Sequence, residues 1–265
     1  MKRFFRKLDY VLCLMGINLP KFTYSMWRLI GYYNDYIKIR KQQNNSTNSF
    51  RLRLSSPCVN DMFSESGSIH DHYFQQDLYV AQKIFQHNPR HHVDVGSRID
   101  GFVAHVASFR PIEVIDIRPL SSPIINVTFK QADMMAPLPG DMYDYCDSLS
   151  SLHAIEHFGL GRYGDSINYD GFVSGLDNLY LMLKKGGKLY FSVPIGLQRI
   201  EFNAHRVFSV RYLLDFFANK YTIDKFSYID DSYNLHIDVS LADHQACRDN
   251  FGCGYGCGIF EMSKI

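Results

Sequence analysis

A chain of 265 residues with 46% hydrophobic and 21% charged side chains can bury the core of one sizeable α/β domain. Its formal net charge of +1 gives no general attraction to polyanions, so we expect no nucleic acid partner. No apolar run reaches the ~18 residues of a transmembrane helix, and Asp9 and Asn18 interrupt the short N-terminal one, which argues against a signal peptide.

Residues 1–60 are expected to form a basic, aromatic helical arm followed by a polar linker at 42–49, and residues 61–265 the main domain. Residues 1–41 carry nine Lys and Arg side chains against two acidic ones. Two interpretations stay open. The arm either lies on an anionic membrane surface, burying Phe4, Phe5, Leu8, Leu12 and Met15, or forms a solvated face or a lid over the active site.

Six cysteines lie at positions 13, 58, 146, 247, 253 and 257. The last three are too widely spaced for the close pairs of a zinc ribbon, so we expect structural cysteines and no metal. Free cysteines are typical of a reducing compartment, and we expect a cytoplasmic protein, with the N-terminal arm as its peripheral contact if it meets a membrane.

From residue 73 onward, helical and strand patterns alternate. Helices are predicted over 73–86, 101–109, 171–183 (ended by Gly186-Gly187) and 210–219, and strands over 92–95, 112–117, 124–129, 143–148, 188–193, 223–229, 235–240 and 257–263. Such alternation predicts an α/β, doubly wound and mostly parallel sheet. The last two strands leave no room for a crossover helix, which favours an antiparallel hairpin at the C-terminal edge.

The segment His92 to Gly101 is the most informative stretch of the chain. An apolar run ends at Asp94-Val95, Gly96 permits a tight turn, and a helical pattern follows. Open α/β sheets bind nucleotide-like cofactors at such strand-to-helix turns. About twenty residues later a second strand ends in Asp116, a spacing that suits a carboxylate accepting hydrogen bonds from both hydroxyls of a ribose.

The order of these motifs resembles class I S-adenosylmethionine-dependent methyltransferases over about residues 75–263. Four segments carry the resemblance: Asp94 to Ser97, Asp116, Gln131 to Asp133, and Ser151 to His157 with Leu183 to Leu189 after it. A closer similarity is to a domain-of-unknown-function family first catalogued from Caenorhabditis proteins and widespread in bacteria, through Asp94 to Arg98, Ser151 to Gly171, Phe202 to Arg206 and Gly256 to Phe260. The resemblance implies a Rossmann-like sheet of seven strands.

The resemblance also implies a cofactor, S-adenosylmethionine, and its binding residues. Asp116 would hold the ribose hydroxyls, Asp133 the adenine amino group, and Gly96 would admit the methionine portion, with Asp94, Ser97 and Arg98 completing the turn. The sequence departs from the family pattern at Arg98 and Asp100, where glycines are usual. Arg98 would either pair with the cofactor carboxylate or block the pocket.

His153 to His157 also matches the inverted zinc-protease pattern H-x-x-E-H. On a helix, His153 and His157 would share one face and could chelate zinc, with His205 or His236 as an arbitrary third ligand. The alternative is that Glu156 and His157 brace the cofactor loop while Leu152 and Ile155 join the core.

A methyltransferase must align its acceptor, and a general base helps where the acceptor is a hydroxyl or a protonated amine. His153, His157, Asp165 and His205 are the candidate catalytic residues, since each follows a strand on the binding edge. We therefore expect a methyltransferase for a small-molecule or saccharide-like acceptor. The alternatives are a noncatalytic methyltransferase-fold binding or assembly protein, and a zinc hydrolase using His153 and His157.

Overall fold

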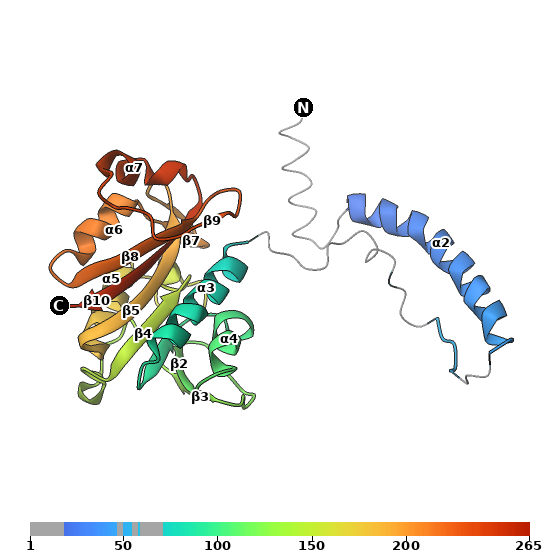
Figure 1. Ribbon diagram of the computed structural model, residues 1–265, viewed down its shortest axis with the longest axis horizontal. Helices are drawn as coiled ribbons and strands as arrows, with labels where there is room; N and C mark the ends of the chain where they lie inside the picture. The colour runs from blue at the N-terminus through green and yellow to red at the C-terminus, as the bar shows by residue number, and fades with distance from the viewer. Residues whose placement is uncertain (1–18, 47–49, 55–57, 59–70) are drawn as a thin grey trace. The chain divides into compact units, whose positions relative to one another are not determined.

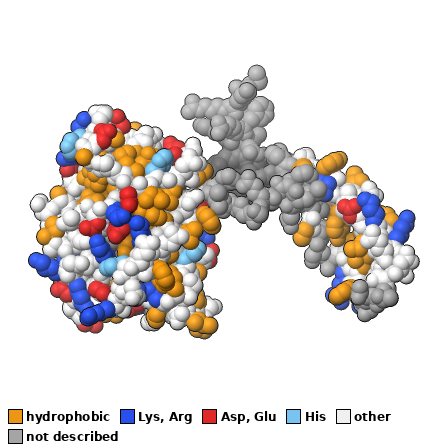
Figure 2. Space-filling view, viewed as in Figure 1, with side chains coloured by type: hydrophobic (Ala, Val, Ile, Leu, Met, Phe, Trp, Pro, Cys, Tyr) orange, Lys and Arg blue, Asp and Glu red, His pale blue; other side chains and the backbone are white. Residues whose placement is uncertain are grey.

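The computed structural model describes residues 19–46, 50–54, 58 and 71–265 (Figure 1). The chain divides into two units, Met1–Ser68 and Ile69–Ile265. In the first unit, helix α2 (Leu19–Gln43) carries Arg40 and Lys41 in its last turn, where positive charges stabilise the negative end of the helix dipole. Hydrophobic side chains of α2 lie among its basic ones (Figure 2), and Phe22 and Ile30 are exposed. The five apolar residues proposed to enter a membrane lie outside the described part of the chain.

No helix of the described residues is both long enough and apolar enough to cross a membrane. The amphipathic contact proposed for the arm stays a prediction.

The second unit is built on an eight-stranded sheet in the order β3-β2-β1-β4-β5-β10-β8-β9. Its strands are β1 (His92–Val95), β2 (Ile112–Asp116), β3 (Val127–Gln131), β4 (Cys146–Leu152), β5 (Leu183–Ile195), β8 (Tyr221–Ile229), β9 (Leu235–His236) and β10 (Gly256–Lys264). The first five pair in parallel, while β10 runs antiparallel to both β5 and β8. A separate antiparallel pair joins β6 (Arg199–Glu201) and β7 (His205–Val207).

Helices cover both faces of the sheet (Figure 1). They are α3 (His72–His87), the π-helical turn η2 (Ile99–Val103), α4 (Ala104–Ala107), α5 (Gly171–Met182), α6 (Val210–Phe217) and α7 (His244–Arg248), with 3-10 turns η3 (Gly140–Met142), η4 (Ile155–His157) and η5 (Asn250–Gly252). Alternate residues of a strand reach opposite faces. In β2, Ile112 and Val114 pack with α3 and α4, whereas Ile115 joins the cluster beneath α5 and α6.

The predicted α/β class, with its mostly parallel sheet and antiparallel edge, is confirmed, but several boundaries are corrected. The edge hairpin consists of β8 and β9, while β10 lies between β5 and β8, so the two last predicted strands do not pair with each other. The two-residue β9 brings the sheet to eight strands in place of seven. The expected 101–109 helix is replaced by η2 and the short α4.

Three further boundaries move for local reasons. Strand β3 begins only at Val127, because Asn126 adopts a φ of 63° and Ile125 is exposed. Strand β4 extends to Leu152, because its serines are buried and hydrogen bonded. Helix α5 ends at Met182, and Gly186-Gly187 lies inside β5.

Leu149, at the centre of β4, is completely buried, and Leu149→Ala should lower the free energy of unfolding by about 2–5 kcal/mol through loss of apolar contact and an unfilled cavity. Leu197→Ala makes the same chemical change at a side chain that is 77% exposed, and should change it by less than about 0.5 kcal/mol. Urea unfolding of both variants measures the difference, and equal losses would contradict the described core.

Candidate active site

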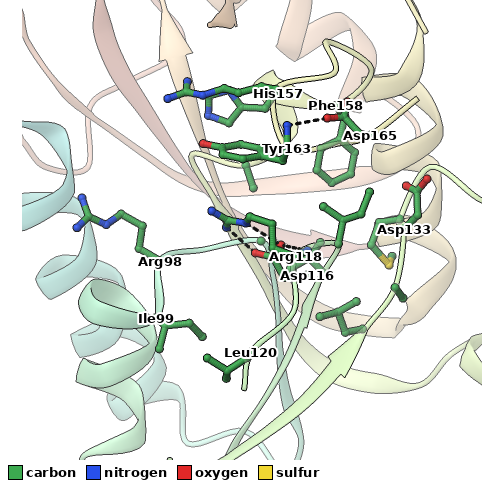
Figure 3. A pocket seen from close by; sticks show the side chains of 18 of the residues that line it. Arg98, Ile99, Asp116, Arg118, Leu120, Asp133, His157, Phe158, Tyr163 and Asp165 are labelled. Carbon is green, nitrogen blue, oxygen red and sulfur yellow. Dashed lines mark hydrogen bonds and ion pairs between the residues drawn. The ribbon is translucent and has the colours of Figure 1, made fainter. Parts of the chain in front are cut away.

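A cavity of about 510 Å³ opens at the carboxyl ends of the parallel strands (Figure 3). The residues at or just after the ends of β1, β2, β3 and β4 line it, as expected where parallel strands end at one edge of a sheet. The lining includes seven of the ten predicted site residues: Gly96, Arg98, Asp116, Asp133, His153, His157 and Asp165. We call this the strand-end cavity. Asp94, Ser97 and His205 do not line it.

Asp94 and Ser97 brace the turn after β1 from within the protein. The Asp94 carboxylate accepts hydrogen bonds from Ser97 N (3.0 Å), Ser97 Oγ (2.6 Å) and Ser150 Oγ (2.6 Å), and both residues are buried. Burial raises the pKa of Asp94 to about 7, although its hydrogen bonds oppose the shift. The expectation that these two side chains contact the cofactor is therefore corrected: they shape the turn that borders the cavity.

Gly96 has a φ of 76°, in the left-handed region that favours glycine. A Cβ atom at this position would lie 2.8 Å from the Cβ of Ala154. The turn after β1 thus approaches the segment after β4 closely enough to exclude a side chain, and backbone borders the cavity there.

Asp116 ends β2, and Arg118 occupies both of its carboxylate oxygens. Arg118 Nε lies 3.0 Å from Oδ1 and Nη2 lies 2.6 Å from Oδ2, while the Arg118 backbone N donates to Oδ1 at 2.8 Å. The Arg118 guanidinium also lies over the ring of Tyr163, 4.5 Å from its centroid (Figure 3). Sequence reasoning missed Arg118, although it stands two residues after the strand-end acid.

Arg98 neither fills the cavity nor stands without partners. Its guanidinium pairs with Asp100, with Nη2 2.8 Å from Oδ2, and lies 5.0 Å from the centroid of the Tyr73 ring. Its side chain is 50% exposed. Arg98, Asp100 and Tyr73 all line the cavity, so the two residues that replace the usual glycines add a charged pair to its wall. Asp133 lies on the lining with Oδ1 accepting from Met135 N at 2.8 Å.

The segment after β4 buries a histidine–carboxylate pair. His153 Nδ1 donates to Glu156 Oε1 at 2.7 Å, and both side chains are buried. His157 Nδ1 donates to the carbonyl oxygen of Ala204 at 2.6 Å, which leaves Nε2 as the ring nitrogen that can accept a proton. His153 Nε2 and Glu156 Oε2 are buried without a hydrogen-bond partner among the described residues.

The zinc interpretation is corrected by this geometry. His153 has a φ of 51° and precedes a 3-10 turn, so it does not share an α-helical face with His157. Among the described residues no three His, Cys, Asp or Glu side chains are grouped to hold a metal ion.

The pKa values of His153 and His157 are shifted in opposite directions. Burial lowers the pKa of His153, but Cys257 and the Glu156 carboxylate outweigh it and raise the value to about 10. Burial lowers the pKa of His157, and Glu156 only partly offsets that effect. The raised pKa of His153 favours its protonated form, paired with Glu156, and the lowered pKa of His157 favours its neutral form.

Asp165 and Arg206 hold the loop that carries Tyr163. The Asp165 carboxylate accepts from the backbone N–H groups of Gly159, Gly161 and Tyr163, at 2.8–3.1 Å. These bonds indicate a structural carboxylate, which corrects its expected role as a base. The buried Arg206 guanidinium donates to carbonyl oxygens of residues 156, 158, 168 and 169. Arg206 belongs to the segment Phe202 to Arg206, which contributes to the family resemblance, but the sequence assigned this arginine no role.

His205, the fourth catalytic candidate, lies apart from the cavity lining. Its ring packs against Tyr255 with centroids 5.0 Å apart, and burial lowers its pKa. His205 is therefore not carried into the chemistry of the cavity.

Removal of the Asp94 carboxylate should destabilise the domain. Asp94→Ala removes the acceptor of three buried donors. Ser150 Oγ still lies 3.2 Å from His92 Nε2, so the two donors of Ser97 are left unmet, and at about 1–3 kcal/mol each we expect a loss of at least about 2 kcal/mol. Asp141→Ala, at an exposed aspartate, is the matched control and should stay within about 0.5 kcal/mol of wild type. Urea unfolding compares them, and similar small losses would show that Asp94 does not hold the turn.

Histidine-selective NMR titration should separate the two buried imidazoles. His153 should remain protonated at pH 8, whereas His157 should be neutral at pH 7, because their pKa values are raised and lowered respectively. In Glu156→Gln, His153 loses its countercharge while burial remains, so its pKa should drop markedly. The resonances are assigned with His153→Gln and His157→Gln. A His153 signal that titrates near 6.5 in both proteins would contradict the ion pair.

Comparison with known proteins places the fold. Residues 121–247 match the family model described as Caenorhabditis protein of unknown function, DUF268. A comparison with curated proteins gives no match. Among solved structures, the chain is similar to the 1,6-didemethyltoxoflavin-N1-methyltransferase of Burkholderia thailandensis with bound 1,6-didemethyltoxoflavin and S-adenosylhomocysteine, at 14% identity and a TM-score of 0.51, covering 72% of this chain and 79% of that one.

The N-methyltransferase NodS of Bradyrhizobium japonicum WM9, in complex with S-adenosylhomocysteine, is similar at 12% identity and a TM-score of 0.47, covering 72% of this chain and 85% of that one. The assignment of the fold rests on the Burkholderia structure. The chain has the fold of class I S-adenosylmethionine-dependent methyltransferases, and its residues 121–247 match the DUF268 family.

Proposed function

We propose that this protein is an S-adenosylmethionine-dependent methyltransferase that acts on a small-molecule or saccharide-like acceptor. One observation carries the proposal: the strand-end cavity brings the glycine turn after β1 and the strand-end acid Asp116 to a single wall. This combination of exposed backbone and a carboxylate suits a ribose-containing cofactor.

The residues present fit such a cofactor. Gly96 offers backbone where a Cβ would meet Ala154, so the turn allows close approach of the methionine portion. The carboxylate of Asp116, with a side chain 11% exposed, faces the cavity and can accept from two ribose hydroxyls when Arg118 yields its oxygens. Asp133 and Arg98 both line the cavity, and we propose that Asp133 accepts from the adenine amino group and that Arg98 pairs with the cofactor carboxylate. When bound, S-adenosylmethionine supplies an activated methyl group.

The protein must then orient the acceptor and receive its proton. His157 lines the cavity, and its Nδ1–H is fixed on the Ala204 carbonyl, so Nε2 can accept the proton of an acceptor hydroxyl. His153, buried in its pair with Glu156, is proposed to position the segment after β4 and not to act as a second base. The Tyr73 and Tyr163 rings supply amphipathic walls that suit a saccharide-like acceptor.

Calorimetric titration with S-adenosylmethionine and S-adenosylhomocysteine tests the proposal. Wild-type protein should bind both, and Asp116→Ala should weaken binding by about 1.5–3 kcal/mol, or roughly 10- to 150-fold, through loss of a charged hydrogen-bond acceptor. Asp215→Ala removes the partner of Arg211 on the exposed surface of α6 and serves as the control. Its affinity should match wild type.

Two results would count against this function. An unchanged affinity in Asp116→Ala would mean that the ribose binds elsewhere. Absence of binding to folded wild-type protein would favour the noncatalytic binding or assembly protein.

A further inference from the structure

The Asp116 carboxylate has a partner that any ribose must replace. Arg118 contacts both oxygens through its guanidinium, and its own backbone amide supplies a third hydrogen bond. A ribose diol needs the same two oxygens. The side chain of Arg118 is 45% exposed and that of Asp116 is 11% exposed, so the guanidinium is the partner with space to move. Cofactor binding therefore implies that Arg118 turns to another partner.

Arg162 is a second cation beside the same aromatic ring. Its guanidinium carbon lies 5.2 Å from the Tyr163 centroid, and that of Arg118 lies 4.5 Å from it. Arg162 Nη1 donates to the carbonyl oxygen of Ala204 at 2.8 Å, and among the described residues no carboxylate lies within ion-pair distance of it. Asp165, three residues away, is occupied by backbone amides. The charge of Arg162 at the cavity wall is thus without a counterion in the described chain.

We propose that Arg118 and Arg162, which both lie against the Tyr163 ring and line the same cavity, bind an anionic group of the acceptor, with phosphate as the group that two guanidiniums suit best. Planar guanidinium groups recognise phosphate through paired hydrogen bonds. The inference rests on the proposed function, because cofactor binding at Asp116 is what releases Arg118. It narrows the acceptor to a phosphorylated small molecule, such as a sugar phosphate.

The arrangement couples the two ligands. An anion that attracts Arg118 frees Asp116 for the ribose, and a ribose on Asp116 frees Arg118 for the anion. Thermodynamic linkage requires both effects to have the same magnitude. Arg118→Met retains the backbone amide that orients Asp116 but removes the competing guanidinium.

Calorimetry with S-adenosylhomocysteine, with and without inorganic phosphate at constant ionic strength set by chloride, tests this coupling. Without phosphate, Arg118→Met should bind S-adenosylhomocysteine about two- to fivefold more tightly than wild type, since an exposed ion pair no longer competes. Phosphate should tighten binding to wild type by up to the same two- to fivefold, because it draws away the guanidinium that Arg118→Met removes. Neither Arg118→Met nor Arg162→Met should respond to phosphate.

Arg211→Met is the matched control, because Arg211 forms a comparable two-pronged pair with Asp215 on α6. It should behave as wild type in every titration, and unchanged thermal unfolding midpoints show that each variant is folded. If wild type binds S-adenosylhomocysteine but phosphate leaves its Kd unchanged, or if Arg118→Met binds it more weakly, the anion site is wrong while the proposed function stands. If no protein binds S-adenosylhomocysteine, the proposed function fails and this inference fails with it.

Discussion

The buried carboxylate of Asp94 joins the neighbouring strands β1 and β4 at the edge where the cavity opens. It accepts from Ser97 in the turn after β1 and from Ser150 in β4, while Ser97 Oγ in turn accepts from Leu152 N. Ser151 Oγ adds a bond to the carbonyl oxygen of Val95. These contacts fix the distance between the glycine turn and the segment that begins at His153. Apart from Tyr73, which lies in α3, the side chains proposed to act on cofactor or acceptor belong to one of those two segments or to the neighbouring ends of β2 and β3.

These buried hydrogen bonds between β1 and β4 explain which features could be predicted from the sequence. The glycine turn, the acid at Asp116 and the alternation of helices and strands follow from local patterns, and the structure has all three. The end of β4 could not be found in the same way, because its serines look like loop residues until Asp94 and Val95 are opposite them. Buried polar side chains break the apolar pattern on which strand prediction depends.

The wall of the cavity was harder to predict because it depends on contacts between distant segments. Arg118 meets Tyr163 across 45 positions of the chain, and Arg206 reaches back to the loop that follows β4. No local period signals such pairs. The roles expected for Asp165 and His205 were wrong for a similar reason, because residue type alone suggested catalysis. In the structure Asp165 accepts from backbone amides and His205 packs against Tyr255, and both contacts indicate structural roles.

The loop that carries Tyr163 is held more firmly than the side chains of Arg118 and Arg162. Arg206 ties four carbonyl oxygens of the loop to one buried guanidinium, and Asp165 ties three of its amides to one carboxylate, so Tyr163 is presented on a preorganised loop. Arg118 and Arg162, in contrast, are exposed residues with surface-accessible side chains. A fixed aromatic ring beside two exposed cations would let one cavity hold a cofactor and an anionic acceptor together, because only the arginines have to rearrange.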